Sequence, residues 1–166
     1  MITLGIRASA KKIYYTIIDD KDNEFDILTI GNILIPQALT LPDRLCFVKT
    51  NVASIIKEFK VVIGGIRICE LIAIKNNIQS SIERCYYEGV ILELFSDCTV
   101  NYYFEGRKQF IASALGEKTE KITEYINGLE CYEIGEWHTF SKEIREAILI
   151  ALASSTKLAS EGVVLQ

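Results

Sequence analysis

The tripeptide Gly-Ile-Arg occurs twice in the chain, at Gly5-Ile6-Arg7 and again at Gly65-Ile66-Arg67. The first copy ends an apolar strand predicted over residues 2–6. The second follows Val61-Val62-Ile63, a continuous apolar run that is typical of a strand buried on both faces. An arginine is therefore expected at the end of each of these two strands.

The apolar pattern around these two segments predicts an alternation of strands and helices. Strands are predicted over residues 2–6, 13–18, 25–30, 61–63 and 99–104. Helices are predicted over residues 48–59, 80–95, 107–115 and 117–127, and from Ser141 to about Leu158. Ser80 and Glu83 have the spacing of a capping box, and Ser141 can cap the last helix.

This order of elements predicts an α/β fold with a mixed five-stranded sheet. The first three strands, joined by tight turns, form an antiparallel meander. The later strands arrive by right-handed crossovers, which place the fourth strand beside the first and parallel to it, with helices on both faces. No repeat or linker interrupts the pattern, so residues 1–166 are predicted to form one domain. Sites in such sheets form at the carboxyl ends of the parallel strands.

The composition limits the possible classes of protein. With 49% hydrophobic and 24% charged residues over 166 positions, the chain is not a disordered protein, and its apolar content predicts a homodimer face. A net charge of −4 argues against a generally cationic nucleic-acid binder but permits a local basic patch. We expect a cytoplasmic protein without membrane contact, because the N-terminus lacks a signal-peptide pattern and the longest apolar run, residues 147–153, cannot span a bilayer. The five cysteines are expected to be reduced and mostly buried.

From residue 2 to about residue 154, the order and spacing of elements resemble the ribonuclease-H-like superfamily, in particular the RuvC-type Holliday-junction resolvases. Those enzymes carry Gly-Ile-Asp at the end of strand one, Glu at the end of strand four, and two acids three residues apart in the last helix. The resemblance implies that these four acids hold two divalent metals for phosphodiester hydrolysis. In this chain the matching positions are Arg7, Arg67, Glu143 and Glu146.

The two arginines change the chemistry that the resemblance implies. A guanidinium is always charged and cannot ligate a metal, whereas two-metal hydrolysis needs several anionic oxygens around cations about 4 Å apart. One interpretation is that Glu143 and Glu146 pair with Arg7 and Arg67, so that an ion-pair network replaces the metal cluster.

The other interpretation is that the arginines face solvent and bind phosphate. Further basic residues are expected at the same end of the sheet or soon after it: Lys11, Lys12, Arg107, Lys108, Lys118 and Lys121. The acids of the second turn are placed at the opposite end: Asp19, Asp20, Asp22, Glu24 and Asp26. Such a separation of charge would steer an anionic partner.

The leading hypothesis is a catalytically degenerate RuvC-like domain that binds nucleic acid, or another phosphorylated or protein partner, without hydrolysis and without a cofactor. Two alternatives stay open. An active nuclease dependent on Mg²⁺ or Mn²⁺ could use Glu70, Glu143 and Glu146, with Glu143 and Glu146 as the metal ligands. A purely structural or dimeric interaction module would need no such site. The single histidine, His138, is expected to pack or cap rather than act as a base.

Overall fold

The computed structural model describes residues 1–21, 24–70, 78–98, 100–132 and 134–161. Within these residues the strands form one mixed sheet in the order β3-β2-β1-β4-β5. The strands are β1 (Ile2–Ala8), β2 (Lys12–Lys21), β3 (Glu24–Leu34), β4 (Ile63–Arg67) and β5 (Tyr102–Gly106). The predicted α/β class, with a mixed five-stranded sheet, is confirmed.

The register of the sheet brings the two arginines together. β1 pairs antiparallel with β2, and β2 pairs antiparallel with β3, as the predicted meander requires. β1 pairs parallel with β4, and β4 pairs parallel with β5. In the β1–β4 ladder Gly5 lies opposite Gly65 and Arg7 opposite Arg67. The predicted placement of the fourth strand beside the first is therefore confirmed.

The boundaries of the fourth strand were predicted wrongly. It covers Ile63–Arg67 rather than residues 61–63, so both glycines lie within it. Glycine normally weakens a strand, but here the helix above the sheet comes too close for a side chain. A Cβ on Gly65 would lie 2.4 Å from the Ser154 hydroxyl, and a Cβ on Gly5 would lie 2.1 Å from the Ala147 carbonyl oxygen.

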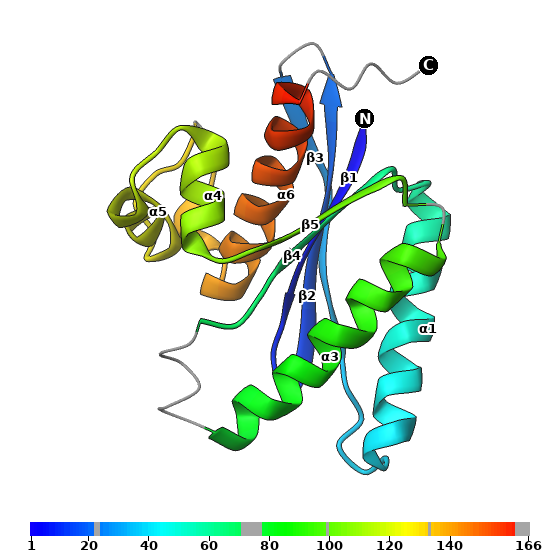
Figure 1. Ribbon diagram of the computed structural model, residues 1–166. Coiled ribbons are helices and arrows are strands. Elements are labelled where there is room, and N and C mark those ends of the chain that lie inside the picture. The colour runs from blue at the N-terminus through cyan, green and yellow to red at the C-terminus, as the bar shows by residue number, and fades with distance from the viewer. Residues whose placement is uncertain (22–23, 71–77, 99, 133, 162–166) are drawn as a thin grey trace.

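Helices cover both faces of the sheet, as Figure 1 shows. They are α1 (Leu41–Phe59), α3 (Ile78–Asp97), α4 (Lys108–Leu115), α5 (Thr119–Ile126) and α6 (Lys142–Ser160), with a short 3-10 helix over Trp137–Thr139. One hydrophobic core lies between the sheet and α1 with α3, and a second joins the sheet to α4, α5 and α6. The domain is thus a three-layer sandwich with the sheet in the middle.

Several helix ends differ from the prediction. α1 begins at Leu41, earlier than predicted, because the Thr40 side chain caps it and Pro42 fits its first turn. α3 begins at Ile78, so Ser80 lies inside the helix and is not its cap. Ser141 does cap α6: its hydroxyl accepts a hydrogen bond from the Ile144 amide at 3.3 Å. The predicted strand over 99–104 includes Thr99, which lies outside the described residues, and β5 runs on to Gly106.

Two further expectations concern the surface. Cys46 and Cys85 are exposed, so the expectation of mostly buried thiols holds for Cys69 and Cys131 only; Cys98 is half-buried. In the described part of the chain, no helix is long and apolar enough to cross a membrane. α6, although apolar, is buried because it lies between the sheet and the α4–α5 pair.

Candidate functional site

The candidate site lies at the end of the sheet where β1, β4 and β5 finish. Arg7 is the penultimate residue of β1, and Arg67 is the last residue of β4. Because neighbouring strands in a sheet are about 4.8 Å apart, the two arginine backbones are held side by side. The first turns of α6, which carry Glu143 and Glu146, lie over these strands. The fold thus places Arg7, Arg67, Glu143 and Glu146, the four positions that match the acids of the resolvases, at one end of the sheet.

Glu146 is bound by both arginines. Arg7 Nε donates to Glu146 Oε2 at 2.8 Å, and Arg67 Nη2 lies 3.4 Å from Glu146 Oε1. The side chains of Arg67 and Glu146 are 2% and 6% exposed, so this contact is closed to solvent. Each oxygen of the carboxylate therefore faces a guanidinium.

Glu70 completes the cluster on its other side. Its Oε1 accepts a hydrogen bond from Arg67 Nη2 at 2.7 Å and another from the backbone amide of Lys108 at 3.1 Å. Since Lys108 is the first residue of α4, Glu70 links the end of β4 to the start of that helix. Arg7, Arg67, Glu70 and Glu146, which we call the strand-end network, balance two positive charges with two negative charges.

The network sets the protonation of its members. Burial raises the pKa of Glu146, but Arg7 and Arg67 outweigh this, and its pKa lies below the ordinary glutamate value. Burial lowers the pKa of Arg67, while Glu146 and Glu70 oppose that change. A guanidinium stays protonated in proteins, so Arg67 is a buried cation that depends on its two carboxylate partners.

A second buried ion pair lies beside this network and was missed in the sequence. Arg84 Nε donates to Glu88 Oε1 at 2.5 Å, and both residues are on α3. Arg84 Nη2 also donates to the Arg67 carbonyl at 2.7 Å, and Glu88 Oε2 accepts from the Cys69 amide at 3.2 Å. The four-residue spacing of Arg84 and Glu88 was visible, but such pairs are usually solvated, and the spacing does not show which way they face.

Glu143 has different surroundings, although it lies only three residues before Glu146. It is half-buried and makes no ion pair with any residue that the structure describes. It lines an open cavity of about 370 Å³ together with Ser9, Lys11, Lys12, Tyr14 and Ser80. Burial raises the pKa of Tyr14, the negative charge of Glu143 adds to this, and Arg7 opposes it.

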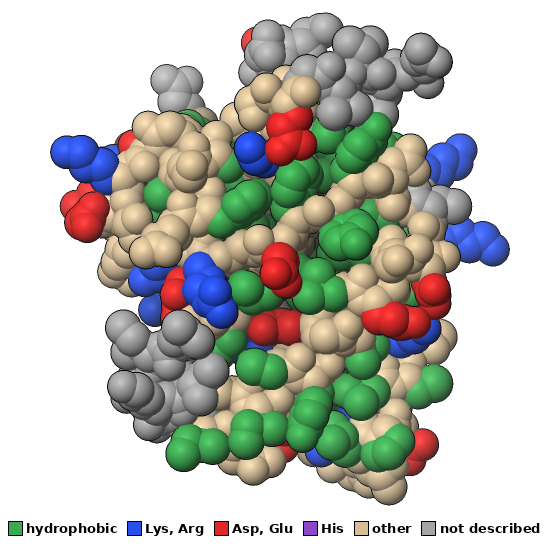
Figure 2. Space-filling view, viewed as in Figure 1, with side chains coloured by type: hydrophobic (Ala, Val, Ile, Leu, Met, Phe, Trp, Pro, Cys, Tyr) green, Lys and Arg blue, Asp and Glu red, His purple; other side chains and the backbone are tan. Residues whose placement is uncertain are grey.

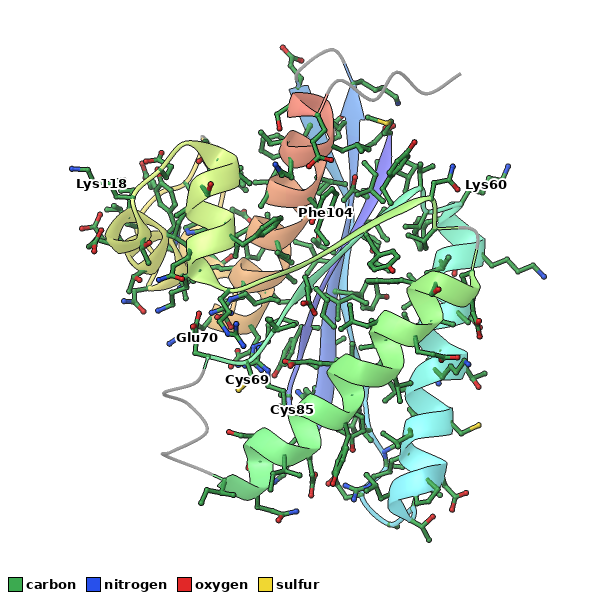
Figure 3. All side chains as sticks on the ribbon, viewed as in Figure 1. Lys60, Cys69, Glu70, Cys85, Phe104 and Lys118 are labelled. Atoms are coloured by element: carbon green, nitrogen blue, oxygen red, sulfur yellow. The ribbon has the colours of Figure 1, made fainter. Side chains whose placement is uncertain are left out.

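The predicted basic residues separate into two groups. Lys11 is exposed and Lys12 half-buried at the β1–β2 turn, while Arg107 and Lys108 are half-buried directly after β5. Figure 2 shows basic side chains around the start of α4. Lys118, by contrast, projects from the α4–α5 side of the molecule away from Glu70 (Figure 3), so it does not join the others at the strand ends.

The acids of the β2–β3 turn lie at the other end of the sheet, as predicted. Asp19 lies opposite Ile2 in the β1–β2 ladder, whereas Arg7 lies opposite Tyr14. Asp19 pairs with the N-terminal ammonium at 3.0 Å and with Lys21, and Asp20 accepts from the Ser155 hydroxyl. Part of this negative charge is therefore neutralised locally. Asp22 lies outside the described residues.

These side chains do not fit the pair of divalent metals that the resemblance implies. Cationic groups occupy both strand-end positions, and both oxygens of Glu146 already face guanidinium groups. Throughout the described ranges, no three His, Cys, Asp or Glu side chains form a group that could hold a metal ion. Glu70 and Glu146 both contact Arg67, so a cation between them would meet a buried positive charge.

Comparison with known proteins identifies the fold. No protein-family model matches the sequence, and no curated protein matches it. Among solved structures, Thermus thermophilus RuvC superposes with a TM-score of 0.73 at 11% identity, covering 97% of both chains. The structure of T. thermophilus RuvC in complex with a Holliday junction substrate gives 0.72 at 12% identity over 96% of both chains. The yeast mitochondrial Holliday junction resolvase gives 0.61 at 13% identity, covering 95% of this chain and 80% of that one.

The sheet order, the parallel β1–β4–β5 unit and the long α6 define a ribonuclease-H-like domain. Within that class the fold is the one found in RuvC and other Holliday junction resolvases, and the resemblance inferred from the sequence is confirmed at the level of fold. At identities of 11 to 13%, the likeness shows the fold alone.

Proposed function

We propose that this protein is a non-hydrolytic nucleic-acid-binding domain of RuvC-like fold, in which the strand-end network takes the place of metal-binding acids. One observation carries the proposal: Glu146 accepts a hydrogen bond from Arg7 Nε at 2.8 Å and also contacts the buried Arg67. A carboxylate held in this way is a structural counter-ion. It is not free to coordinate a metal.

Electrostatics supports the loss of hydrolysis. Two divalent cations bring four positive charges, and hydrolytic sites of this kind offset them with several carboxylates. Here Arg7 and Arg67 add two positive charges at the same place. Freeing Glu146 for a metal would leave Arg67, which is 2% exposed, without one of its two partners.

The fold and the basic residues around the strand-end network favour nucleic acid as the partner. Because the strand-end network is balanced, an approaching anion meets the cations around it: Lys11 and Lys12 on one side, Arg107 and Lys108 on the other. The two lysines lie at the start of β2, and Arg107 and Lys108 directly follow β5. These two strands are three positions apart in the sheet, which is about 14 Å at ordinary strand spacing. That separation can be spanned by a few nucleotides of phosphate backbone. Arg67 is too buried to touch the ligand, so the proposed contact surface leaves it out.

The test combines a binding assay with a cleavage assay on the same DNA. The parent protein is incubated with labelled four-way junction, duplex and single-stranded DNA, in the presence of Mg²⁺ or Mn²⁺. We expect binding at low salt and no cleavage. Metal-dependent cleavage that disappears in Glu146→Ala would overturn the proposal and support the nuclease that uses Glu70, Glu143 and Glu146.

A second candidate function is the binding of a protein partner or of a second copy of the chain, and one observation favours it. Ile78, Ile82 and Tyr86 are spaced four residues apart on α3 and are all exposed, at 62%, 39% and 48%. Figure 2 shows hydrophobic side chains along the part of the surface where α3 begins. Absence of DNA binding at low salt, together with a dimeric mass by light scattering that Ile78→Lys makes monomeric, would favour this function.

A further inference from the structure

Two cysteines from different elements lie beside the strand-end network. Cys69 lies two residues after β4, and Cys85 lies on α3. Figure 3 labels both, at the end of β4 and on the adjacent stretch of α3. Cys69 is buried and Cys85 is exposed. The two thiols therefore form a pair in which one member is open to reagents in solution and the other is shielded.

Hydrogen bonds from the helix fix the segment that carries Cys69. Glu88, three residues after Cys85, accepts from the Cys69 amide at 3.2 Å. Arg84, the residue before Cys85, donates to the Arg67 carbonyl at 2.7 Å. Beyond desolvation, Cys69 contributes to the raised pKa of Cys85, and the Cys69 Sγ donates to the Glu70 carbonyl oxygen at 3.6 Å. The segment that carries Cys69 is thus held against the turn of α3 that carries Cys85.

We infer that Cys69 and Cys85 form a reversible intramolecular disulfide when the protein meets a peroxide. The inference does not rest on the proposed function, because it concerns only the two thiols and the backbone that holds them.

The reaction proceeds in two steps that balance. The Cys85 thiolate attacks one oxygen of hydrogen peroxide; an S–O bond forms, the O–O bond breaks, and the departing hydroxide takes up the thiol proton as water. The Cys69 sulfur then attacks the Cys85 sulfenic acid; the S–S bond forms, the S–O bond breaks, and a second water leaves with the Cys69 proton. Two thiols are oxidised by two electrons while one peroxide is reduced to two waters.

The disulfide would join two elements that are otherwise connected at this point by hydrogen bonds from α3 side chains to the backbone at the end of β4. It ties the end of β4, which carries Arg67 and Glu70, to the stretch of α3 that carries Arg84 and Glu88. Oxidation would therefore fix the position of Glu70 relative to α3, on one side of the proposed nucleic-acid surface.

The experiment treats the full chain with hydrogen peroxide, blocks remaining thiols by alkylation, and maps peptides by mass spectrometry without reduction. Partial desolvation raises the pKa of the exposed Cys85, and Glu88 and Cys69 add to this, so the reaction is run at mildly alkaline pH, where more thiolate is present. Cys85→Ser is the test variant, because its side chain is exposed and the change leaves the core intact. Cys46→Ser, at an exposed position on α1, is the matched control.

We expect the parent and Cys46→Ser to lose two free thiols and to yield one cross-linked peptide pair containing Cys69 and Cys85, which a thiol reductant separates. Cys85→Ser should yield no such pair. The inference is overturned if the parent keeps all its thiols free, if Cys85 reacts only between molecules, or if Cys69 links to another cysteine instead.

Discussion

Glu143 and Glu146 lie less than one helical turn apart at the start of α6 and have opposite surroundings. Glu146 is buried, and each of its oxygens faces an arginine of the sheet. Glu143 is half-buried and lines an open cavity with Lys11 and Lys12. The resemblance seen in the sequence implies that these two acids act on the same metals. In this chain the strand-end arginines separate them into a structural carboxylate and one that faces solvent.

A charged site can therefore keep its position in a fold while its chemistry changes. The backbone still brings the ends of β1 and β4 under the first turns of α6. With arginine at both strand ends, the carboxylate that faces them becomes part of a closed network. Under the proposed function, ligand binding involves groups outside the network, and Lys11 and Lys12 line the cavity together with Glu143.

The largest effect on stability is expected from removing the buried carboxylate of Glu146. Glu146→Ala leaves Arg67 buried with one partner fewer, and we expect a loss of about 3–5 kcal/mol in the free energy of unfolding, as for one partner of a buried ion pair. Glu143→Ala is the matched control on the same helix. Its only expected loss is the interaction with the helix dipole, about 0.3–1 kcal/mol. Urea denaturation measures both; equal losses would mean that the two glutamates are alike.

The next largest effect is expected in the free energy of unfolding as the pH is lowered. The pKa of Glu146 is lower in the folded chain than the ordinary value of 4.5, which the unfolded chain is expected to show. Its contribution is therefore complete above that value and is lost as the pH falls through the folded pKa.

We expect the stability advantage of the parent over Glu146→Gln to be constant near neutral pH and to shrink below about pH 4.5. Asp19, whose pKa is lowered by Lys21 and the N-terminus, contributes equally to both proteins and cancels in the difference. An advantage that grows as the pH falls would contradict the arginine pairing.

A moderate effect on DNA binding is expected from the lysines that line the open cavity. Reversing both charges at the cavity, with Lys11→Glu and Lys12→Glu, should weaken DNA binding at low salt by about tenfold or more and lower the salt slope by about 0.9 for each phosphate that the protein no longer neutralises. The matched control is Lys57→Glu with Lys60→Glu. Both lysines are exposed at the end of α1, and their reversal makes the same change in charge. Figure 3 shows Lys60 far from Glu70. Equal weakening by both pairs would show that binding follows net charge and has no defined surface.

The smallest effect on DNA affinity is expected from Glu143 itself. Removing its charge with Glu143→Gln takes one anion away from the cavity that holds Lys11 and Lys12, so DNA affinity should rise by about two- to fivefold, a typical effect for a partly exposed charge. Glu120→Gln, at an exposed position on α5, is the control with the same change in net charge. Fluorescence anisotropy titrations measure the affinities. A fall in affinity with Glu143→Gln would place the ligand elsewhere.

The sequence predicts the fold and the neighbouring positions of Arg7 and Arg67 because these follow from element order and from the handedness of crossovers. The three-residue spacing of Glu143 and Glu146 predicts that both lie near these arginines, but it does not reveal that only one turns inward. That choice depends on how close α6 lies to Gly5 and Gly65, which is a property of packing.

Other features were beyond sequence reasoning for similar reasons. The extent of β4 was missed because Gly64-Gly65 interrupts the apolar run, although α6 and α3 cover both faces of the strand. The inward Arg84–Glu88 pair looks like an ordinary surface pair in the sequence. Lys118 follows β5 closely in the chain, but α4 carries it away from the strand ends.

A crystal soaked in Mn²⁺ shows whether the strand-end network excludes a metal, because anomalous scattering locates the metal independently of any activity. We expect no Mn²⁺ peak among Glu70, Glu143 and Glu146, and we expect Arg7 Nε to stay within hydrogen-bonding distance of the Glu146 carboxylate, as at 2.8 Å here. A Mn²⁺ ion held by two or more of these glutamates, with Arg7 or Arg67 displaced from Glu146, would contradict the account and restore the metal-dependent nuclease.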